Sequence, residues 1–530
     1  MKLYVVQMKI LPGNVPANVQ AMKAAFDRAK AAEVDCVVFP RNALTGPSNK
    51  ALPVDWAEIR KYAGNMPFFL CGDVLDDTPL LNVAHVTHGS DFYVVGRREV
   101  ENKELSHLAK DCAMPVVCLN GVGTDNTGKN IYALSGGSRV FDCDGKIVFE
   151  MPLFSEAEAV VEFVDGNVQV YAESAKPYPS EIAEIHDALV FMIRENLKMF
   201  HISRMVIGAS GGIDSAVSAV LYSEAIGPEN VFLVNMPTRF NSDTTKNAAR
   251  DLAENLGTPY MVAPISDIIE SVCHTLERCS FVRNDTVMKV AGINHENLQA
   301  RTRSASILST VASVVGGGVT CNGNKSEAMV GYCTLYGDSC GVMCAIGDLW
   351  KTQVYELARY INRDKEIIPK ASIDIPASAE LSEAMNVDEG KGDPILYPYH
   401  DKLFAMWVEK GVSLNFTEKL LLEGTLCESL GVDAVYFKSK LPTVEAALED
   451  MRLWYRRFKG LALAKRIQFP PILSAVLRAD DHYRLSDGTT PPPLPVYQIL
   501  HRARCYILRS LWHHRHGIVV YFLRSFFTCQ

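Results

Sequence analysis

Short apolar runs alternate with helical stretches over the first third of the chain. Apolar residues recur at helical spacing over 19–32, with Asn18 as the expected N-cap, and over 103–111. Asp142 to Lys146 reads Asp-Cys-Asp-Gly-Lys, a hairpin signal between strands at 138–141 and 147–149. Further buried strands are expected at 3–6, 36–39, 68–71, 94–95 and 116–119. The pattern predicts an α/β layered domain over residues 1–170.

A second alternation begins after a Pro- and Ser-containing connector at 174–179 and an amphipathic helix at 181–199. Its expected strands lie at 205–207, 231–235 and 260–262, and its expected helices at 213–222 and 242–256. This order predicts a doubly wound parallel sheet with right-handed crossovers over residues 177–484. Ligands of such sheets bind at the carboxyl ends of the strands.

Residues 485–530 differ in composition from both preceding segments. Pro491-Pro492-Pro493-Leu494-Pro495 interrupts regular structure, and from Gly488 onward there are five arginines, four histidines, no lysine and no acidic residue. Two interpretations remain open: a basic amphipathic segment for a membrane surface, or an unselected irregular tail such as an altered reading frame would give. We favour the tail, because its apolar positions have poor helical periodicity.

Composition narrows the class of partner. The chain has 530 residues, 48% of them hydrophobic and 22% charged, which is ordinary for a globular protein of two or three domains. A net charge of −8 argues against nucleic-acid binding. We expect no secretory signal and no membrane span up to about residue 480, and we read the 14 scattered cysteines as reduced. Together these features predict a cytoplasmic protein.

The most informative motif is Ser-Gly-Gly-Ile-Asp-Ser at 210–215, where a predicted strand turns into a predicted helix. Glycines there leave backbone N–H groups open, and the helix N-terminus adds partial positive charge, so the turn can hold a pyrophosphate. The Asp214 carboxylate can supply an oxygen ligand to the Mg²⁺ that accompanies a nucleotide. We therefore predict an ATP-binding turn formed by Gly208, Ala209, Ser210, Gly211, Gly212, Ile213, Asp214 and Ser215.

A second half of this site is predicted after the glycine-rich strand expected at 316–322. Asn324-Lys325-Ser326-Glu327 follows that strand, so Glu327 and Asp214 should meet at one edge of the sheet. Two carboxylates there can share a Mg²⁺ bound to ATP phosphates. Lys351 opens the helix expected at 351–360 and can neutralise phosphate, although an exposed lysine at a helix start would look the same.

A loop at 331–338 (Gly-Tyr-Cys-Thr-Leu-Tyr-Gly-Asp) carries donors, acceptors and aromatic rings suited to a second, polar substrate. Asn297 and Arg301 share one face of a predicted helix by their spacing, although such a pair more often marks a solvated helix face. Lys465 and Arg466 form a basic pair for which phosphate binding and plain solvation remain equal alternatives.

These motifs together resemble the glutamine-dependent NAD synthetases over about residues 180–484. The turn at 210–215 is shared by a wider group of ATP pyrophosphatases, including GMP and asparagine synthetases. The resemblance is narrowed by the ordered set 297–303, 324–327, 331–338, 351–355 (Lys-Thr-Gln-Val-Tyr) and 376–381 (Pro-Ala-Ser-Ala-Glu-Leu). It implies that deamido-NAD is adenylated by ATP with Mg²⁺, and that ammonia then displaces AMP to give NAD.

The resemblance also implies roles for individual residues. Catalysis would involve Asp214, Glu327 and Lys351, with Asp214 and Glu327 as metal ligands. ATP would bind residues 208–215 and Asn322, and deamido-NAD would bind Asn297, Glu327, Tyr332, Asp338 and Lys465. This chain departs from the family at Asn322, where a threonine is usual, and at 463–468, where Lys465 is kept but its neighbours differ. The family also implies a homo-oligomer.

The first domain resembles the nitrilase-like amidase that supplies ammonia to such synthetases. Residues 37–46 match the strand end that carries the family's catalytic glutamate, but Arg41 stands at that position, and an arginine is no general base. The segment that should carry the catalytic lysine and cysteine looks absent, and Cys71 follows too soon to replace that cysteine. We expect a truncated, inactive amidase and an ammonia-dependent enzyme, with glutamine as a substrate only if the amidase is active.

Two other functions remain open on the sequence. A different ligase of the same superfamily would share the turn at 210–215, although the block at 324–338 argues against it. A decayed, non-catalytic nucleotide-binding protein would explain Arg41, the missing segment and the tail, whereas the retention of Asp214 and Glu327 favours activity.

Overall fold

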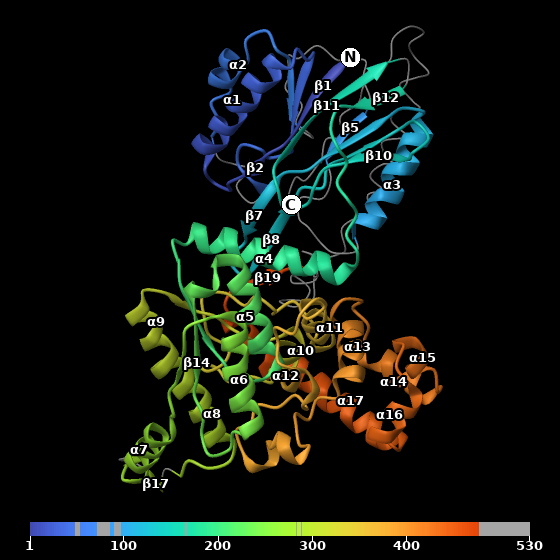
Figure 1. The fold of residues 1–530 in the computed structure, drawn as a ribbon. Helices are drawn as coiled ribbons and strands as arrows, with labels where there is room; N and C mark the ends of the chain where they lie inside the picture. Colours follow the sequence, from blue (N-terminus) through green and yellow to red (C-terminus); the bar gives the residue numbers. More distant parts are fainter. Residues whose placement is uncertain are drawn as a thin grey trace. The chain divides into compact units, whose positions relative to one another are not determined.

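The structure is a computed structural model that describes residues 1–47, 53–70, 85–88, 97–164, 167–281, 284–287 and 289–475. The described chain divides into two compact units, drawn in Figure 1. The first comprises residues 1–127 and 131–181, and the second comprises residues 128–130 and 182–475. Among the described residues, no helix combines the length and the apolar character that crossing a bilayer requires.

The first unit is a layered α/β structure built from two main sheets. One sheet has the strand order β12-β11-β1-β3-β4 and the other β10-β9-β6-β5, and β2, β7 and β8 form a further short sheet. Its elements are β1 Lys2–Gln7, β2 Lys9–Ile10, α1 Val15–Ala31, β3 Cys36–Phe39, α2 Trp56–Ala63, β4 Phe68–Leu70, β5 His85–His88, α3 Arg97–Cys112, β6 Val116–Leu119, β7 Val122–Asn126, β8 Asn130–Ser135, β9 Arg139–Phe141, β10 Ile147–Glu150, β11 Ala157–Val164 and β12 Asn167–Val170.

The alternation of side chains along its strands gives this unit four layers. One face of β1 and β3 packs on α1 and α2 through a core that includes Phe26 and Phe39. The opposite face, including Val5 and Val38, packs on β6, β9 and β10 of the second sheet. Helix α3 covers the outer face of that second sheet. Since successive residues of a strand point to opposite faces, continuous apolar strands are what an α-β-β-α sandwich requires.

Most strands predicted for this unit are confirmed, including the hairpin of β9 and β10. The start of the first helix was wrong, because α1 begins at Val15 with Asn14 as its N-cap. Pro16 lies in the first turn of α1, where a proline is tolerated, so the helix extends further back than its apolar spacing indicates. Asn18 lies buried inside α1 and donates to the carbonyl oxygens of Leu11 and Leu44. The strand predicted at 94–95 lies outside the described residues.

The second unit is built on a parallel sheet with the strand order β15-β14-β13-β18. Its elements are α4 Glu181–Met199, β13 Met205–Gly208, α5 Ile213–Ile226, β14 Val231–Asn235, α6 Asp243–Leu256, β15 Tyr260–Val262, α7 Ser266–Glu277, β16 Ser280–Phe281, β17 Asn284–Val287, α8 Ile293–Arg301, a π-helical turn Thr302–Leu308, α9 Ser309–Val315, β18 Gly318–Val319, α10 Lys325–Val330, α11 Lys351–Ile361, α12 Lys370–Asp374, α13 Tyr397–Val408, α14 Leu414–Leu422, α15 Leu426–Leu430, α16 Ala434–Lys440, α17 Val444–Lys459, α18 Leu461–Gln468 and β19 Ile472–Ser474, with single 3₁₀ turns at Pro228–Asn230, Glu383–Met385 and Val387–Glu389.

The strand order indicates which edge of this sheet is suited to bind a ligand. The chain winds outward from β13 through β14 to β15 and then returns to β18 on the other side of β13. The loops that follow β13 and β18 therefore diverge, and such a switch point is where open α/β sheets bind ligands. The predicted parallel sheet and doubly wound order are confirmed.

The helices from α13 to α18 pack together over an aromatic core. Trp407, Trp454 and Phe404 are buried there, and α10 contributes Met329 to the same cluster. The orange and red helices of Figure 1 show this group beside α10 and α11. The C-terminal part of the unit therefore supports the helices that follow β18.

The strand predicted at 316–322 is shorter than expected, because β18 covers only Gly318–Val319. Gly316 has a φ of 68° and ends α9 in the left-handed conformation. An added Cβ at Gly317 would come 2.5 Å from the Arg204 carbonyl oxygen. These glycines are used for a helix end and a close backbone approach rather than for a long strand.

Candidate active site

The turn at 208–215 joins β13 to α5 and is held open by its own side chains. The Ser210 Oγ lies 3.0 Å from the Ser215 Oγ and accepts the Gly212 N–H at 3.2 Å. The Ser215 Oγ donates to the Gly212 carbonyl oxygen at 3.0 Å. Both hydroxyls thus hold the backbone of the turn through contacts within the turn itself.

Gly211 is required for this conformation. Its φ is +84°, and an added Cβ would lie 2.0 Å from the Thr245 carbonyl oxygen on α6. The Ser372 hydroxyl donates to the Gly211 carbonyl oxygen at 2.8 Å. Helix α5 then begins at Ile213 with no side chain capping its N-terminus. Open N–H groups and the helix dipole at such a terminus favour a phosphate.

The loop after β18 leads into α10, which brings the Glu327 carboxyl group to the N-terminus of α5. Asn324 caps α10 through its side chain, which accepts the Glu327 N–H at 3.1 Å, and the Glu327 carboxyl accepts the Asn324 N–H at 3.4 Å. The Asn324 amide also donates to the Asp214 carboxylate at 3.2 Å. This capping box therefore orients Glu327 and ties α10 directly to the N-terminus of α5.

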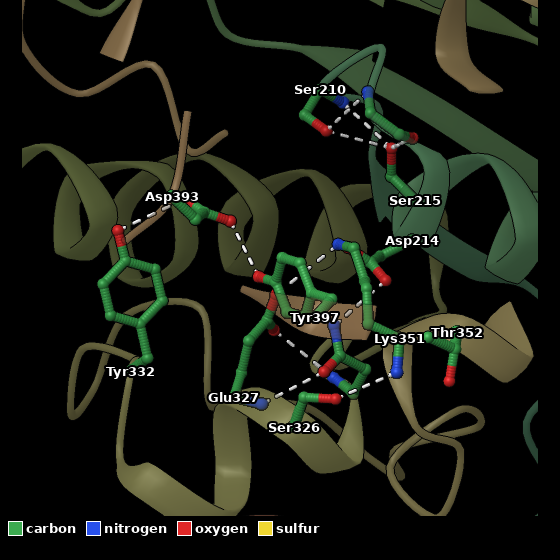
Figure 2. Close-up of polar contacts among 12 residues, drawn as sticks. Ser210, Asp214, Ser215, Ser326, Glu327, Tyr332, Lys351, Thr352, Asp393 and Tyr397 are labelled. Atoms are coloured by element: carbon green, nitrogen blue, oxygen red, sulfur yellow. Dashed lines mark hydrogen bonds and ion pairs between the residues drawn. The ribbon is translucent and has the colours of Figure 1, made fainter. Parts of the chain in front are cut away.

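Lys351 joins the two predicted metal ligands. Its ammonium contacts the Asp214 carboxylate and lies 3.7 Å from the Glu327 Oε1, as Figure 2 shows. The lysine is only 3% exposed, so its alternative as an exposed helix-start residue was wrong. Burial would lower the pKa of Lys351, but the Asp214 and Glu327 carboxylates outweigh it, and the pKa is raised.. The predicted convergence of the two acids is thus present in the structure.

Glu327 has a strongly shifted titration. Burial, and next the negative charge of Asp214, raise its pKa to about 8, and Lys351 opposes the rise. A carboxyl with such a pKa takes up or releases a proton near neutral pH even with the Lys351 ammonium beside it. Strongly shifted acids in a cleft are typical of functional sites.

Three helices meet around one buried carboxylate that the sequence analysis missed. Asp401 on α13 accepts the Ser326 hydroxyl of α10 at 2.6 Å and the Thr352 N–H of α11 at 2.9 Å. The Ser326 Oγ in turn accepts the Lys351 N–H at 2.9 Å. Asp401 is 1% exposed and so caps α11 at the point where Lys351 leaves it. An acid within the apolar sequence of α13 was the available signal.

Asp393 is a second residue that the sequence analysis missed. Its carboxylate accepts the Tyr332 hydroxyl at 3.2 Å and the Tyr397 hydroxyl at 2.8 Å (Figure 2). The Lys351 ammonium lies 5.3 Å from the centre of the Tyr397 ring. Burial raises the pKa of Asp393, while Lys351 and both hydroxyls lower it. Asp393 therefore places Tyr332 beside the cluster that Lys351 forms with Asp214 and Glu327. The loop that carries Asp393 has no recognisable motif.

Side chains of α8 and α18 hold the loop at 331–338. The Asn297 Oδ1 accepts the Thr334 hydroxyl at 2.8 Å, and the Arg301 Nε donates to the Leu335 carbonyl oxygen at 3.1 Å. The Lys465 ammonium donates to the carbonyl oxygens of Gly331, at 2.7 Å, and Cys333. Asn297 and Lys465 are partly buried and support the loop, whereas Arg301 bonds to it from an exposed position on α8.

Two other predicted residues, Asp338 and Asn322, lie near the end of β18 and have different surroundings. The exposed Asp338 accepts the Thr334 N–H at 2.7 Å and so closes the loop. The Asn322 amide donates to the Gly208 carbonyl oxygen at 3.4 Å, beside the glycine turn. The Asn322 Oδ1 is buried without a partner within the described residues. Asn322 therefore joins β18 to the start of the turn.

The chemistry of the donor set fits a magnesium ion. Asp214 and Glu327 already direct their carboxyl groups at one cation, the Lys351 ammonium, which stands where a metal ion would neutralise them. The described residues contain no cluster of three or more His, Cys, Asp or Glu side chains with metal-site geometry. Mg²⁺ does not require one, since it binds through one or two carboxylates together with substrate phosphates and water.

The described part of the first unit contains a buried ion pair between Arg139 and Glu101 at 3.2 Å, which includes neither Arg41 nor Cys36. Arg41 follows β3, at the strand end where the resemblance places a glutamate. Burial raises the pKa of the Cys36 thiol to about 12 and that of the Cys118 thiol to about 11, so neither is a thiolate near pH 7. Cys71 and the region of the apparent deletion lie mostly outside the described residues.

Comparison with known proteins places these observations in a family context. Residues 185–428 match the family model for NAD synthase. The glutamine-dependent NAD(+) synthetase of Synechocystis sp. is 35% identical over 319 residues, which cover 60% of this chain and 55% of that protein. The enzyme of the same name from Thermotoga maritima is 31% identical over 373 residues, covering 63% of this chain and 62% of the relative. The chain thus spans less than two thirds of the length of these relatives.

Solved structures extend the likeness in fold to both units. A glutamine-dependent NAD(+) synthetase from Cytophaga hutchinsonii matches with a TM-score of 0.69 at 15% identity, over 92% of this chain and 100% of that chain. A glutamine-dependent NAD+ synthetase from Acinetobacter baumannii in complex with ADP matches with a TM-score of 0.62 at 23% identity, over 90% and 96%. At these identities they bear out the predicted fold class and carry nothing further.

Proposed function

We propose that this chain converts deamido-NAD to NAD with ATP and ammonia as the other substrates, because residues 185–428 match the family model for NAD synthase. The observation that carries the proposal is the meeting of Asp214, Glu327 and Lys351 beside the open N-terminus of α5. This arrangement suits a reaction between anions. A carboxylate must attack the α-phosphorus of ATP, and both reactants repel each other until cations neutralise them.

The residues of the site divide this task. The turn at 208–215 and the N-terminus of α5 would hold the phosphates, since their open N–H groups face the end of the sheet. Asp214 and Glu327 would hold Mg²⁺, which supplies positive charge to the phosphates when bound. Lys351 would contact a phosphate oxygen. Tyr332, with the loop at 331–338 that Asn297 and Lys465 support, would position the nicotinate end of deamido-NAD.

No side chain of the site needs to form a covalent bond. The deamido-NAD carboxylate attacks the α-phosphorus and pyrophosphate leaves, and ammonia then attacks the activated carbonyl so that AMP leaves. Positioning of the reactants and neutralisation of their charge account for the rate. The predicted residue roles follow from this scheme, and each is open to substitution.

We propose further that ammonia, and not glutamine, is the nitrogen source. Arg41 replaces the expected general base, and the buried thiols of Cys36 and Cys118 lack thiolate character. The relatives bear the name glutamine-dependent, so the absence of glutaminase activity would distinguish this chain from them. Assembly into homo-oligomers stays an expectation from the resemblance.

The test supplies the full chain with ATP, Mg²⁺ and deamido-NAD, together with either ammonium chloride or ammonia-free glutamine. We expect NAD and AMP to form in equal amounts with ammonium and no NAD to form with glutamine. The variant Asp214→Asn should lose NAD formation, whereas Lys402→Met, on the exposed side of α13, should keep it. Glutamine-supported NAD formation that disappears in Cys71→Ala would contradict the ammonia dependence.

The same assay separates the alternatives. AMP release with another carboxylate substrate, but not with deamido-NAD, would indicate a different ligase of the superfamily. Nucleotide binding without any AMP release would indicate a non-catalytic protein. The contact of the buried Lys351 ammonium with two acidic side chains favours a catalytic protein over a non-catalytic one, because charged groups removed from water are costly to keep without a use.

A further inference from the structure

Lys351 contacts the same oxygens that a metal ion would use. Its ammonium pairs with the Asp214 carboxylate and lies 3.7 Å from the Glu327 Oε1. Neither carboxyl group has a second cationic side chain within ion-pair distance in the part of the chain that the structure describes. One ammonium therefore lies against both carboxyl groups in the structure.

A divalent ion and this ammonium are mutually exclusive at that point. Two cations that share oxygens would lie within about 4 Å of each other, where their repulsion in a site shielded from water is large. Lys351 is 3% exposed, so solvent does little to screen that repulsion. Binding of the metal between Asp214 and Glu327 thus requires the ammonium to leave.

The geometry lets only the side chain move. The Lys351 backbone is fixed at the start of α11 by the Ser326 hydroxyl, which Asp401 holds from α13. The four-carbon stem of the lysine can still rotate. The N-terminus of α5 lies directly beside Asp214, so phosphates bound there would offer the departing ammonium a new anionic partner.

We propose that Lys351 occupies the metal site as a substitute cation and yields it only when nucleotide phosphates bind. The inference rests on the proposed function, since that function supplies the metal and the triphosphate. It adds an order of events: the free protein binds divalent cations weakly, and metal and nucleotide enter together. By linkage, each of the two ligands then strengthens the binding of the other.

The test measures Mn²⁺ binding to the full chain at pH 8 without nucleotide, by calorimetry and by the loss of the free-ion electron paramagnetic resonance signal. We expect Lys351→Met and Lys351→Gln to bind Mn²⁺ at least tenfold more tightly than the wild type. Lys351→Arg keeps the charge and should bind as weakly as the wild type. Lys402→Met removes an exposed lysine of α13 and controls for net charge.

Adding Asp214→Asn to Lys351→Met should abolish the gain, which locates the ion between the two carboxyl groups. Equal Mn²⁺ affinity in the wild type and both neutral variants would overturn the proposal. Failure of both neutral variants to fold even with Mg²⁺ present would also overturn it, because a metal that replaces the ammonium should stabilise the same carboxylates. The readout needs neither deamido-NAD nor ammonia, so a chain without synthetase activity could still show the gain.

Discussion

Replacing Glu327 by glutamine should stabilise the second unit while abolishing its activity. The side chain keeps its size, and its amide oxygen can still accept the Asn324 N–H that the carboxyl accepts at 3.4 Å. What disappears is a buried acid whose pKa is raised from 4.5 to about 8 by burial and by the Asp214 charge. In the proposed function Glu327 is a ligand of Mg²⁺, and a neutral amide binds that ion more weakly than a carboxylate, so NAD formation should be lost.

The magnitude follows from the linkage between proton binding and folding. Below pH 4.5 the carboxyl is protonated in both the folded and the unfolded chain, so glutamine offers no advantage from titration. Between pH 4.5 and about 8 the unfolded chain releases the proton and the folded chain retains it. The wild type therefore loses stability as pH rises, by up to about 3 kcal/mol at pH 7 and about 5 kcal/mol above pH 8.

Thermal unfolding of the apo protein at several pH values measures this difference. For a unit of this size, about 1 kcal/mol corresponds to about 2 °C, so the variant should unfold several degrees higher at pH 7 and show no gain near pH 4.5. Glu409→Gln is an opposite control, since Glu409 accepts the fully buried Lys325 ammonium at 2.7 Å and its loss should lower the unfolding temperature. A gain independent of pH, or no gain at pH 7 to 8, would refute the reasoning.

Three further substitutions test the surrounding structure. Gly211→Ala should weaken nucleotide binding at least tenfold in a calorimetric titration, because its Cβ would lie 2.0 Å from the Thr245 carbonyl oxygen at a φ of +84°; unchanged affinity would show that the turn tolerates rearrangement. Asp401→Asn should lower kcat about 10- to 100-fold with little change in the KM for ATP. The reason is that the backbone of Lys351 would lose its support while the glycine turn stays intact. Steady-state kinetics would distinguish this result from an equal effect on kcat and KM. Lys465→Met should raise the KM for deamido-NAD about tenfold and leave the KM for ATP within about twofold. The Lys465 ammonium holds only the loop at 331–338. Parallel titrations of the two substrates measure both KM values.

The sequence predicted the fold of both units well because the deciding signals are local. The strands β3, β14 and β15 and the helix α4 have the predicted bounds, since apolar periodicity and flanking Gly, Pro and Asn residues determine where they begin and end. The errors occurred where tertiary contacts decide. Asn18 looked like a cap but is buried by contacts with Leu11 and Leu44, which local pattern does not reveal.

The candidate site was predictable to the extent that its residues lie in motifs. Asp214 and Glu327 stand at fixed places relative to two strand ends, and parallel strands bring their carboxyl ends together. Asp393 and Asp401 escaped prediction because their importance depends on partners more than 40 residues away in sequence, such as Tyr332 and Ser326. The packing of α13 against α10 and α11 brings Asp401 to Ser326, and the loop before α13 brings Asp393 to Tyr332.

The hydrogen bonds by which Asp401 joins α10 to α11 have a consequence for the synthesis of the protein. A ribosome releases Asp214, Glu327 and Lys351 well before it completes α13, so a nascent chain carries all three charged groups without the carboxylate that anchors α10 to α11. The turn at 208–215 can form early from local residues, but Asp401 can join α10 to α11 only after α13 has emerged. A translation product that stops ahead of α13 would keep every recognisable motif residue up to Lys351 and still lack an ordered place for them.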